Sequence, residues 1–93
     1  MAYFVYILRC ADGSYYVGSA EDVAERVKRH NSGDGAEYTA RHRPAVLVYS
    51  EPHPNEASAI LRERQLKRWS RAKKEALIAG DEERLCKLSK RRT

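Results

Sequence analysis

The stretch FVYILRCADGSYYVGS, residues 4–19, constrains the fold more than any other part of the chain. Both alternating sets of side chains in residues 3–8 are largely apolar, which is typical of a strand covered on both faces. Residues 14–19 form a second candidate strand, and ADG between the two is a turn signal. The stretch therefore predicts a hairpin whose first strand is central in a sheet.

The length of the turn decides which tyrosines share a face of this hairpin. A two-residue turn at Asp12 and Gly13 would put Tyr6 and Tyr16 on opposite faces, because the side-chain period of a strand is two. A three-residue loop, residues 11–13, pairs Leu8 with Tyr16 and brings both tyrosines to one face. We predict the three-residue loop, because Gly13 stands where that loop needs a positive φ.

The rest of the chain adds one strand and several helices. A helix is expected after Ser19, where SAED resembles a capping box with Asp22, and residues 45–50 form a third strand that the two following prolines stop. Asn55 and Ser70 are expected to cap two later helices, the second of which ends at Gly80, and residues 81–88 suggest a last short helix. The predicted fold class is α/β, a small antiparallel sheet of at least three strands flanked by helices. We expect one main domain, residues 1–80, followed by a short helix and basic tail, residues 81–93.

Charge is distributed unevenly along the chain. Its formal net charge is +5, and residues 51–93 carry twelve Lys and Arg against seven Asp and Glu, whereas the first fifty residues are balanced. A concentrated basic face suggests an acidic polymer such as nucleic acid, although a solvated helical surface explains the same charge about as well.

Cysteine usage and hydropathy bear on the compartment. Cys10 and Cys86 have neither metal-ligand spacing nor the pattern of a disulfide framework. The apolar run at residues 3–8 is too short to span a bilayer and lacks the features of a signal peptide. We expect a cytoplasmic protein without membrane contact.

A basic pair borders the apolar stripe of the first predicted helix. Val23 and Val27 form the stripe, and Arg26 and His30 lie one helical step apart beside it. Each has a plain alternative role. Arg26 could pair with Asp22, and His30 could cap the C-terminus of the helix, where the helix dipole stabilises a positive charge. Their common direction is what suggests a shared cleft.

Glu63 is the one acid among seven basic residues between Arg62 and Lys74. It can form a salt bridge with Lys67 at i+4, and spacing alone favours that role. Its neighbours Ala59 and Leu66 are apolar, so Glu63 could instead face the sheet and bind a hard cation such as Mg²⁺.

Five side chains together resemble the GIY-YIG nuclease superfamily, and in particular its small stand-alone bacterial members. They are Tyr6 in FVY, Tyr16 in YVG, Arg26, His30 and Glu63. The resemblance runs from about residue 3 to residue 78 and includes HNSGDGAEYTA, LVYSE and ERQLKRWSRAKKEALI. The first motif reads Phe4-Val5-Tyr6 without an opening glycine, a change expected to affect strand packing.

The resemblance implies a metal-dependent endonuclease that hydrolyses DNA phosphodiester bonds. Glu63 would bind Mg²⁺ or Mn²⁺, Arg26 would stabilise charge on the phosphate, and Tyr6 and Tyr16 would position the attacking water. Tyr6 would be the general base, with help from the metal, Arg26 or His30, and His30 could itself relay the proton.

The expected nucleic-acid contacts come from the basic helices and from the glycine-rich connection NSGDGAEYTARHRP, residues 31–44. They are Tyr38, Thr39, Arg62, Lys67, Arg68, Arg71, Lys73 and Lys74, with residues 90–92 of the tail. Such contacts bind the backbone without reading sequence, so cleavage would be structure-selective or non-specific, or a protein partner would direct it. RNA is a further candidate substrate, and DNA repair or recombination the expected pathway. Two other classes stay open: a non-catalytic nucleic-acid-binding module with the same fold, and a small protein–protein adaptor.

Overall fold

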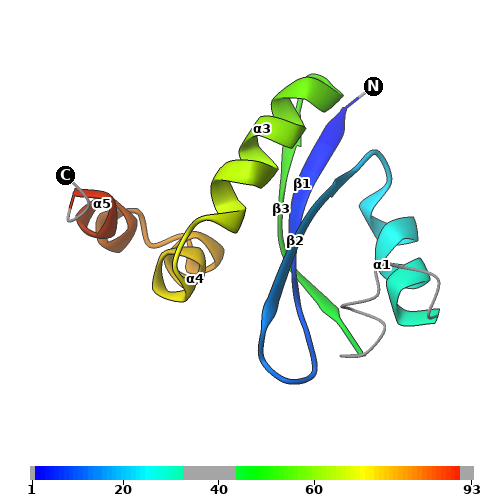
Figure 1. Cartoon of the computed structure of the whole chain (residues 1–93), viewed down its shortest axis with the longest axis horizontal. Coiled ribbons are helices and arrows are strands. Elements are labelled where there is room, and N and C mark those ends of the chain that lie inside the picture. Colours follow the sequence, from blue (N-terminus) through cyan, green and yellow to red (C-terminus); the bar gives the residue numbers. More distant parts are fainter. Residues whose placement is uncertain (1, 33–43, 91–93) are drawn as a thin grey trace.

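The computed structural model describes residues 2–32 and 44–90. Three strands and four helices occur in these ranges, and the labels are those of Figure 1. They are β1 (Tyr3–Arg9), β2 (Tyr15–Ala20), α1 (Val23–Ser32), β3 (Val46–His53), α3 (Glu56–Lys67), α4 (Arg71–Ala79) and α5 (Glu82–Lys90). The predicted α/β class is confirmed.

Strand β1 is the centre of an antiparallel sheet with the order β2-β1-β3. Residues 5–8 of β1 are fully buried. This burial on both faces is what the continuous apolar run predicted.

The hairpin between β1 and β2 has the predicted three-residue loop. Leu8 pairs with Tyr16 and Tyr6 with Gly18, so the two tyrosines share a face. Gly13 has a φ of 87°, and its N–H donates to the carbonyl of Cys10 at 2.9 Å. The left-handed conformation at Gly13 therefore sets the register, as the turn chemistry requires.

Helices α1 and α3 lie on opposite sides of the sheet (Figure 1). Under α3, Val5, Ile7 and Val17 pack against Ala59 and Leu66. On the other face, Tyr6, Leu8 and Ala20 pack with Val23 and Val27 of α1. Alternate residues of one strand thus serve two separate hydrophobic clusters.

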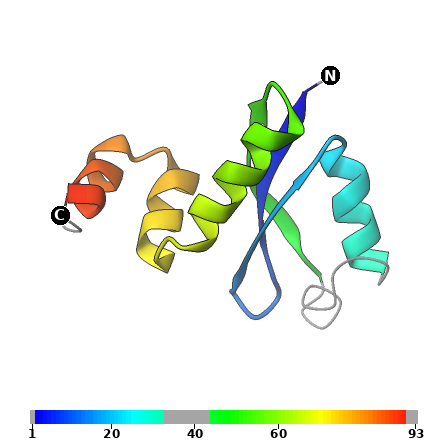
Figure 2. The same cartoon turned by 45° about the horizontal axis from the view of Figure 1, so that its top comes forward.

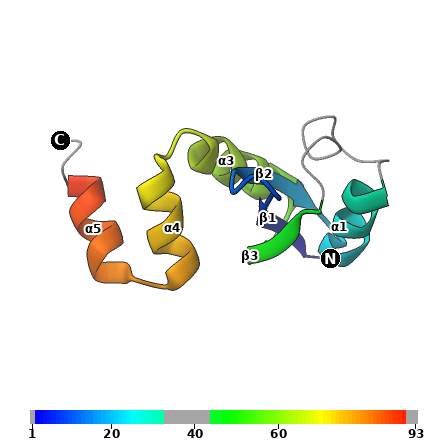
Figure 3. The ribbon, with the colours of Figure 1, turned by 90° about the horizontal axis from the view of Figure 1, so that it is seen from below.

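Helices α4 and α5 extend away from the sheet beyond the end of α3 (Figures 2 and 3). As predicted, Asn55 caps α3, Ser70 caps α4, and Gly80 ends α4 in the left-handed region with φ 71°. Arg71 joins α4 to the hairpin by donating from Nη1 to the carbonyl of Gly13 at 2.7 Å. Helix α5 packs against α4, and the expected domain boundary at residue 80 stays a prediction.

Two local predictions were wrong. Ser19 does not cap α1, because β2 continues through it; Asp22 is the cap, and its Oδ1 accepts from the N–H of Glu25 at 3.0 Å. Pro52 does not stop β3, which continues to His53 with Pro52 opposite Phe4. A proline is tolerated there because β3 is an edge strand and needs no second ladder partner.

No helix among the described residues combines the length and the apolar character needed to cross a membrane.

Candidate active site

The Tyr6 side chain extends from the central strand toward the edge strand β2. It is completely buried, and its hydroxyl lies 3.4 Å from Nε2 of His30. A Cβ atom built on Gly18 would come within 2.5 Å of the same hydroxyl. Gly18 is therefore the residue that leaves room for the Tyr6 hydroxyl at this edge, and His30 supplies the partner that a buried phenol requires.

His30 and Tyr16 complete a cluster on the α1 side of the sheet. The rings of Tyr16 and His30 meet edge to face, with centroids 5.2 Å apart and planes at 63°. His30 is only 2% exposed, so it acts as a core contact of Tyr6 and Tyr16 rather than as a solvated helix cap. Burial, together with the charges of Arg26 and Arg29, lowers the pKa of His30, which makes it a neutral proton acceptor at pH 7.

The environment of Tyr6 keeps its hydroxyl protonated. Burial and the neighbouring Tyr16 raise the pKa of Tyr6 to about 12, although charge and hydrogen bonding from Arg26 oppose the shift. The negative charge of Glu63 adds to the increase. A free phenolate at Tyr6 is thus disfavoured at neutral pH, and Arg26 and Glu63 are both near enough to influence this hydroxyl.

Glu63 approaches the same strand from the opposite side of the sheet. The Ser19 hydroxyl donates to Oε1 of Glu63 at 2.7 Å, and Nζ of Lys67 lies 2.8 Å from Oε2. The Glu63 side chain is 20% exposed, so it is turned toward the sheet instead of into bulk solvent. The salt bridge and the sheet-facing orientation, which the sequence presented as alternatives, occur together.

The edge strand β2 connects the two halves of this arrangement. Gly18 and Ser19 are consecutive, so one lies on the α1 face with Tyr6 and the other on the α3 face with Glu63. The structure therefore gathers four of the predicted side chains, Tyr6, Tyr16, Arg26 and His30, in one cluster. Glu63 reaches the same edge from α3, on the other side of β2.

The donor set suits one cation held by one carboxylate. Within residues 2–32 and 44–90 there is no group of three or more His, Cys, Asp or Glu that could form a closed metal cage. Mg²⁺ commonly binds through one or two carboxylates, waters and substrate phosphates. Glu63 fits that pattern, because Ser19 orients one carboxylate oxygen while the other faces only the half-exposed Lys67.

The basic residues expected to bind nucleic acid have different surroundings. Arg62 is tied to Glu51 at 3.0 Å, Arg71 pairs with Glu75 at 3.3 Å, and Lys73 is buried over the ring of Trp69. Arg68 and Lys67 are exposed. Lys74 is half-buried, and its burial lowers the pKa of its ammonium. Tyr38, Thr39 and residues 91–92 lie outside the described residues.

Sequence reasoning missed the role of Ser19. Its signal was the strand alternation: a residue next to Gly18 must face away from Tyr16 and toward the helix that carries Glu63. Assigning Ser19 to a helix cap hid this relationship. Sequence reasoning also missed the network around Glu51, which accepts from Tyr49 at 2.6 Å and contacts His53 at 2.7 Å in addition to Arg62. That network joins β3 to α3.

The chain matches the family described as the GIY-YIG catalytic domain over residues 2–76. It is 48% identical over 77 residues to UPF0213 proteins of Staphylococcus aureus, such as those of strains Mu3 and N315, which covers 83% of this chain and 94% of each relative.

Two structures solved by solution NMR are also similar. The UPF0213 protein BH0048 from Bacillus halodurans has a TM-score of 0.55 at 44% identity, covering 85% of this chain and 84% of that one. The protein EF2693 from E. faecalis has a TM-score of 0.61 at 32% identity, covering 88% of both chains. These matches show that the chain belongs to the GIY-YIG nuclease family, together with the small bacterial UPF0213 proteins.

Proposed function

We propose that this protein is a divalent-metal-dependent endonuclease that hydrolyses phosphodiester bonds of DNA. The observation that carries the proposal is the meeting of two polar groups at strand β2: the Tyr6–His30 pair on one face and the Ser19–Glu63 pair on the other. This arrangement offers proton transfer and cation binding beside one open strand edge. Membership of a nuclease family supports the same reaction class.

Tyr6 and His30 would move the proton of the attacking water. A phenol with a pKa near 12 is a poor free base at pH 7, but it can accept a proton from water while it passes its own to the neutral His30. The Nε2 atom of His30 is the acceptor in this relay, since it is the atom that faces the Tyr6 hydroxyl. Tyr16 would hold the water and the His30 ring in place.

Arg26 would stabilise the negative charge that develops on the phosphate. Its side chain is half-buried on α1 and acts on the Tyr6 hydroxyl, so it lies beside the proposed reacting water. A guanidinium can contact two phosphate oxygens at once, which an ammonium cannot. Arg26 is therefore the electrostatic partner that we propose for the reaction.

Glu63 would hold the cation, and Ser19 would orient the carboxylate. When bound, Mg²⁺ or Mn²⁺ supplies positive charge to the non-bridging and departing oxygens of the phosphate. Lys67 would leave Oε2 of Glu63 and contact the substrate backbone, because its ammonium is half-exposed and bound by a surface-type ion pair.

Substrate binding would depend on charge rather than on base sequence. The exposed Arg68 and the half-buried Lys74 offer phosphate contacts on the side of α3 and α4. Contacts of this kind make binding depend steeply on salt but not on base sequence, so we expect structure-selective or non-specific cleavage. A protein partner would then direct the enzyme to its target, and DNA repair or recombination is the proposed pathway. RNA is tested beside DNA for the same reason.

The experiment is a cleavage assay on labelled single-stranded, duplex and branched DNA and on RNA, with Mg²⁺, Mn²⁺ or EDTA. Glu63→Gln removes the proposed cation ligand with little change of shape, and Glu82→Gln on α5 is the matched control because Glu82 is exposed and remote. Cleavage should need the divalent ion, persist in Glu82→Gln and disappear in Glu63→Gln. Cleavage that continues unchanged in Glu63→Gln would contradict the proposal.

The second candidate is a non-catalytic nucleic-acid-binding module. The feature that favours it is that both carboxylate oxygens of Glu63 already have a partner: Ser19 donates to Oε1, and Lys67 pairs with Oε2. This candidate predicts salt-sensitive binding by the wild-type protein with no cleavage of any substrate under any metal condition. Affinity measurements alone do not separate the two functions, so the cleavage assay decides.

A further inference from the structure

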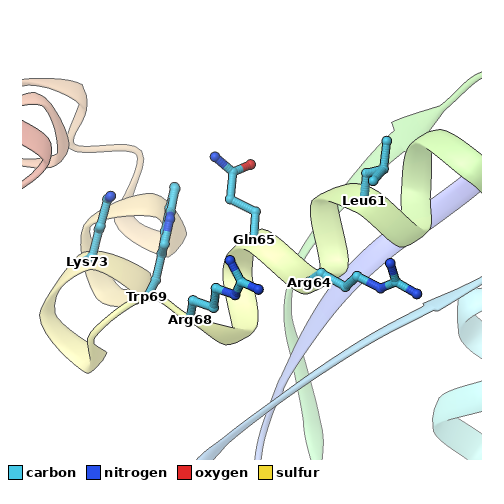
Figure 4. A pocket seen from close by; sticks show the side chains of 6 residues that line it. All are labelled: Leu61, Arg64, Gln65, Arg68, Trp69 and Lys73. Atoms are coloured by element: carbon cyan, nitrogen blue, oxygen red, sulfur yellow. The ribbon is translucent and has the colours of Figure 1, made fainter.

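A second polar site lies on the outer side of α3, at its junction with α4. Here an open pocket of about 490 Å³ is lined by Leu61, Arg64, Gln65, Arg68, Trp69 and Lys73. Figure 4 shows these six side chains, contributed by the last two turns of α3, the junction and the first turn of α4. None of the six belongs to the Tyr6, His30 and Glu63 arrangement, so this pocket is separate from the proposed active site.

Lys73 is the unusual member of the pocket. It is only 7% exposed, and its ammonium lies 4.3 Å from the centroid of the Trp69 ring. Among the described residues no carboxylate forms an ion pair with it. A buried ammonium normally has a counter-ion, because desolvating an unpaired charge is costly. The open pocket is where such a counter-ion can enter.

The remaining lining indicates the chemistry of that counter-ion. Arg64 and Arg68 are exposed and add two positive charges, and no acidic residue lines the pocket. Leu61, at the other end of the pocket from Trp69, is 67% exposed and adds apolar surface. Cations next to apolar and aromatic surface match an anion that carries a flat apolar group, as an unpaired nucleotide does.

The position of the pocket relative to Glu63 favours nucleic acid over an acidic protein segment. Lys67, the last residue of α3, follows Glu63 by four residues, ~6 Å along the helix axis, and Trp69 comes two residues later. Arg64 and Arg68 directly follow Glu63 and Lys67 in sequence and are exposed, so positive charge stands on both sides of the proposed cation ligand and the pocket along α3. One strand can therefore contact both places.

We infer that this pocket binds an unpaired stretch of the substrate strand, with phosphates on Lys73, Arg68 and Arg64 and a base against the edge of Trp69. The inference rests on the proposed function, because it assigns the pocket to the strand that is cleaved. A duplex presents mainly phosphates at its surface, whereas a single strand also offers its bases. The substrate class is thus nucleic acid with a single-stranded segment next to the cleaved bond.

The chain contains a single tryptophan, so the emission of Trp69 reports on the pocket directly. The experiment titrates the protein with a single-stranded oligonucleotide in EDTA, where no cleavage occurs, and measures Trp69 emission together with the anisotropy of a labelled oligonucleotide. Both signals should saturate at the same concentration. A duplex of equal length, inorganic phosphate and a polyglutamate peptide are run in parallel and should change the emission less at equal concentration.

Three variants sharpen the experiment. Arg68→Gln and Arg64→Gln should each weaken single-strand binding roughly three- to tenfold and lower the slope of log affinity against log salt by about 0.7, the value for one lost phosphate contact. Lys73→Met keeps the aliphatic stem over Trp69 and should remove the phosphate contribution. If Lys73→Met does not fold, the two arginine variants still decide, because both arginines are exposed. Arg84→Gln on α5 is the charge-matched control and should bind like wild type.

Several outcomes would overturn the inference. They are emission that stays constant while anisotropy saturates, arginine variants that bind like Arg84→Gln, inorganic phosphate that binds as tightly as the oligonucleotide, and a polyglutamate response that exceeds the nucleic-acid response. Because the titration contains no divalent ion, it is independent of catalysis. Loss of cleavage with an intact emission response would remove the nuclease assignment alone, and the reverse result would remove the pocket assignment alone.

Discussion

The hydroxyl of Ser19 on β2 donates to Oε1 of Glu63 on α3 at 2.7 Å, which orients the carboxylate assigned to the proposed cation. Gly18, the residue before Ser19, lies under the Tyr6 hydroxyl on the other face of the sheet. Two consecutive residues of an edge strand therefore place the two halves of the site. The relationship explains why a short polar residue follows the glycine here.

Removing the Ser19 hydroxyl should loosen Glu63 without changing the fold. We expect Ser19→Ala to lower Mn²⁺ affinity or cleavage roughly tenfold or more, the usual effect of losing a group that orients a metal ligand. Mn²⁺ titration followed by electron paramagnetic resonance measures the Mn²⁺ affinity, and the cleavage assay measures the rate of cleavage. Ser89→Ala, at an exposed position of α5, is the control. A Ser19→Ala protein with wild-type Mn²⁺ affinity and cleavage would show that the hydrogen bond has no such role.

Lys67 competes with a cation for Oε2 of Glu63. Lys67→Met should strengthen Mn²⁺ binding by about two- to threefold, since an i,i+4 ion pair with a half-exposed ammonium is worth only a few tenths of a kcal/mol. The same variant should bind DNA more weakly, because a phosphate contact is lost. Lys87→Met is a close match, as Lys87 and Glu83 form another i,i+4 pair at 3.5 Å. Weaker or unchanged Mn²⁺ binding in Lys67→Met would contradict the competition.

Cleavage should depend on the protonation of His30. Its pKa is lowered by burial and by Arg26 and Arg29, so the neutral form that accepts a proton is dominant above a midpoint below 6.5. The rate should therefore rise with pH along an acid limb whose midpoint lies below 6.5. The raised pKa of Tyr6, about 12, predicts no loss of activity from Tyr6 ionisation near neutral pH. A rate profile with its acid midpoint above 7, or one unchanged in His30→Gln, would exclude the relay.

The same pKa shift affects stability. The unfolded chain binds a proton at His30 more readily than the folded protein, so folding stability falls as the pH drops from 6.5 toward the lowered folded pKa. His30→Gln should reduce this part of the pH dependence in urea unfolding at pH 5 and pH 7.

Gly18 should not tolerate a methyl group. In Gly18→Ala the new Cβ would lie 2.5 Å from the hydroxyl and 2.7 Å from Cζ of Tyr6, and the fully buried ring has little room to move. We expect a loss of about 1 to 3 kcal/mol in the free energy of unfolding, together with reduced cleavage. Tyr6→Phe is the comparison, because it removes the hydroxyl and keeps the ring. Wild-type stability and cleavage in Gly18→Ala would contradict the close packing.

Arg62 and Arg68 lie six residues apart on or beside α3 and should behave differently. Arg62 joins Glu51, whose pKa burial would raise but hydrogen bonds from Tyr49, His53 and Arg62 hold below its usual value. Arg62→Ala should therefore cost roughly 1 to 3 kcal/mol in stability, because it leaves a partly buried carboxylate short of a partner. Arg68→Ala should leave urea unfolding unchanged and weaken DNA binding. Equal stability of the two variants would show that the Glu51 network does not hold β3 to α3.

Local chemistry in the sequence was enough to predict the elements and the hairpin register. The continuous apolar run marked β1 as central, Gly13 specified the loop that puts Tyr6 and Tyr16 on one face, and Asn55 and Ser70 marked helix starts. These features depend on neighbours within a few residues, so they can be read along the chain. The two errors, at Ser19 and Pro52, arose because pairing with β1 extends both edge strands past the points where local signals end them.

The partners of individual side chains depend on contacts between distant parts of the chain. Spacing left Glu63 with either Lys67 or the sheet, and the packing of α3 across β2 gave it both Lys67 and Ser19, a residue 44 positions away. Likewise, the seven basic residues between Arg62 and Lys74 have similar prospects in the sequence but different surroundings in the structure. Four of them contact Glu51, Glu63, Glu75 or Trp69, whereas Arg64 and Arg68 are exposed and Lys74 is half-buried. Short-range rules predict where a side chain leaves the backbone, but burial and pairing energies arise only when separate elements pack together.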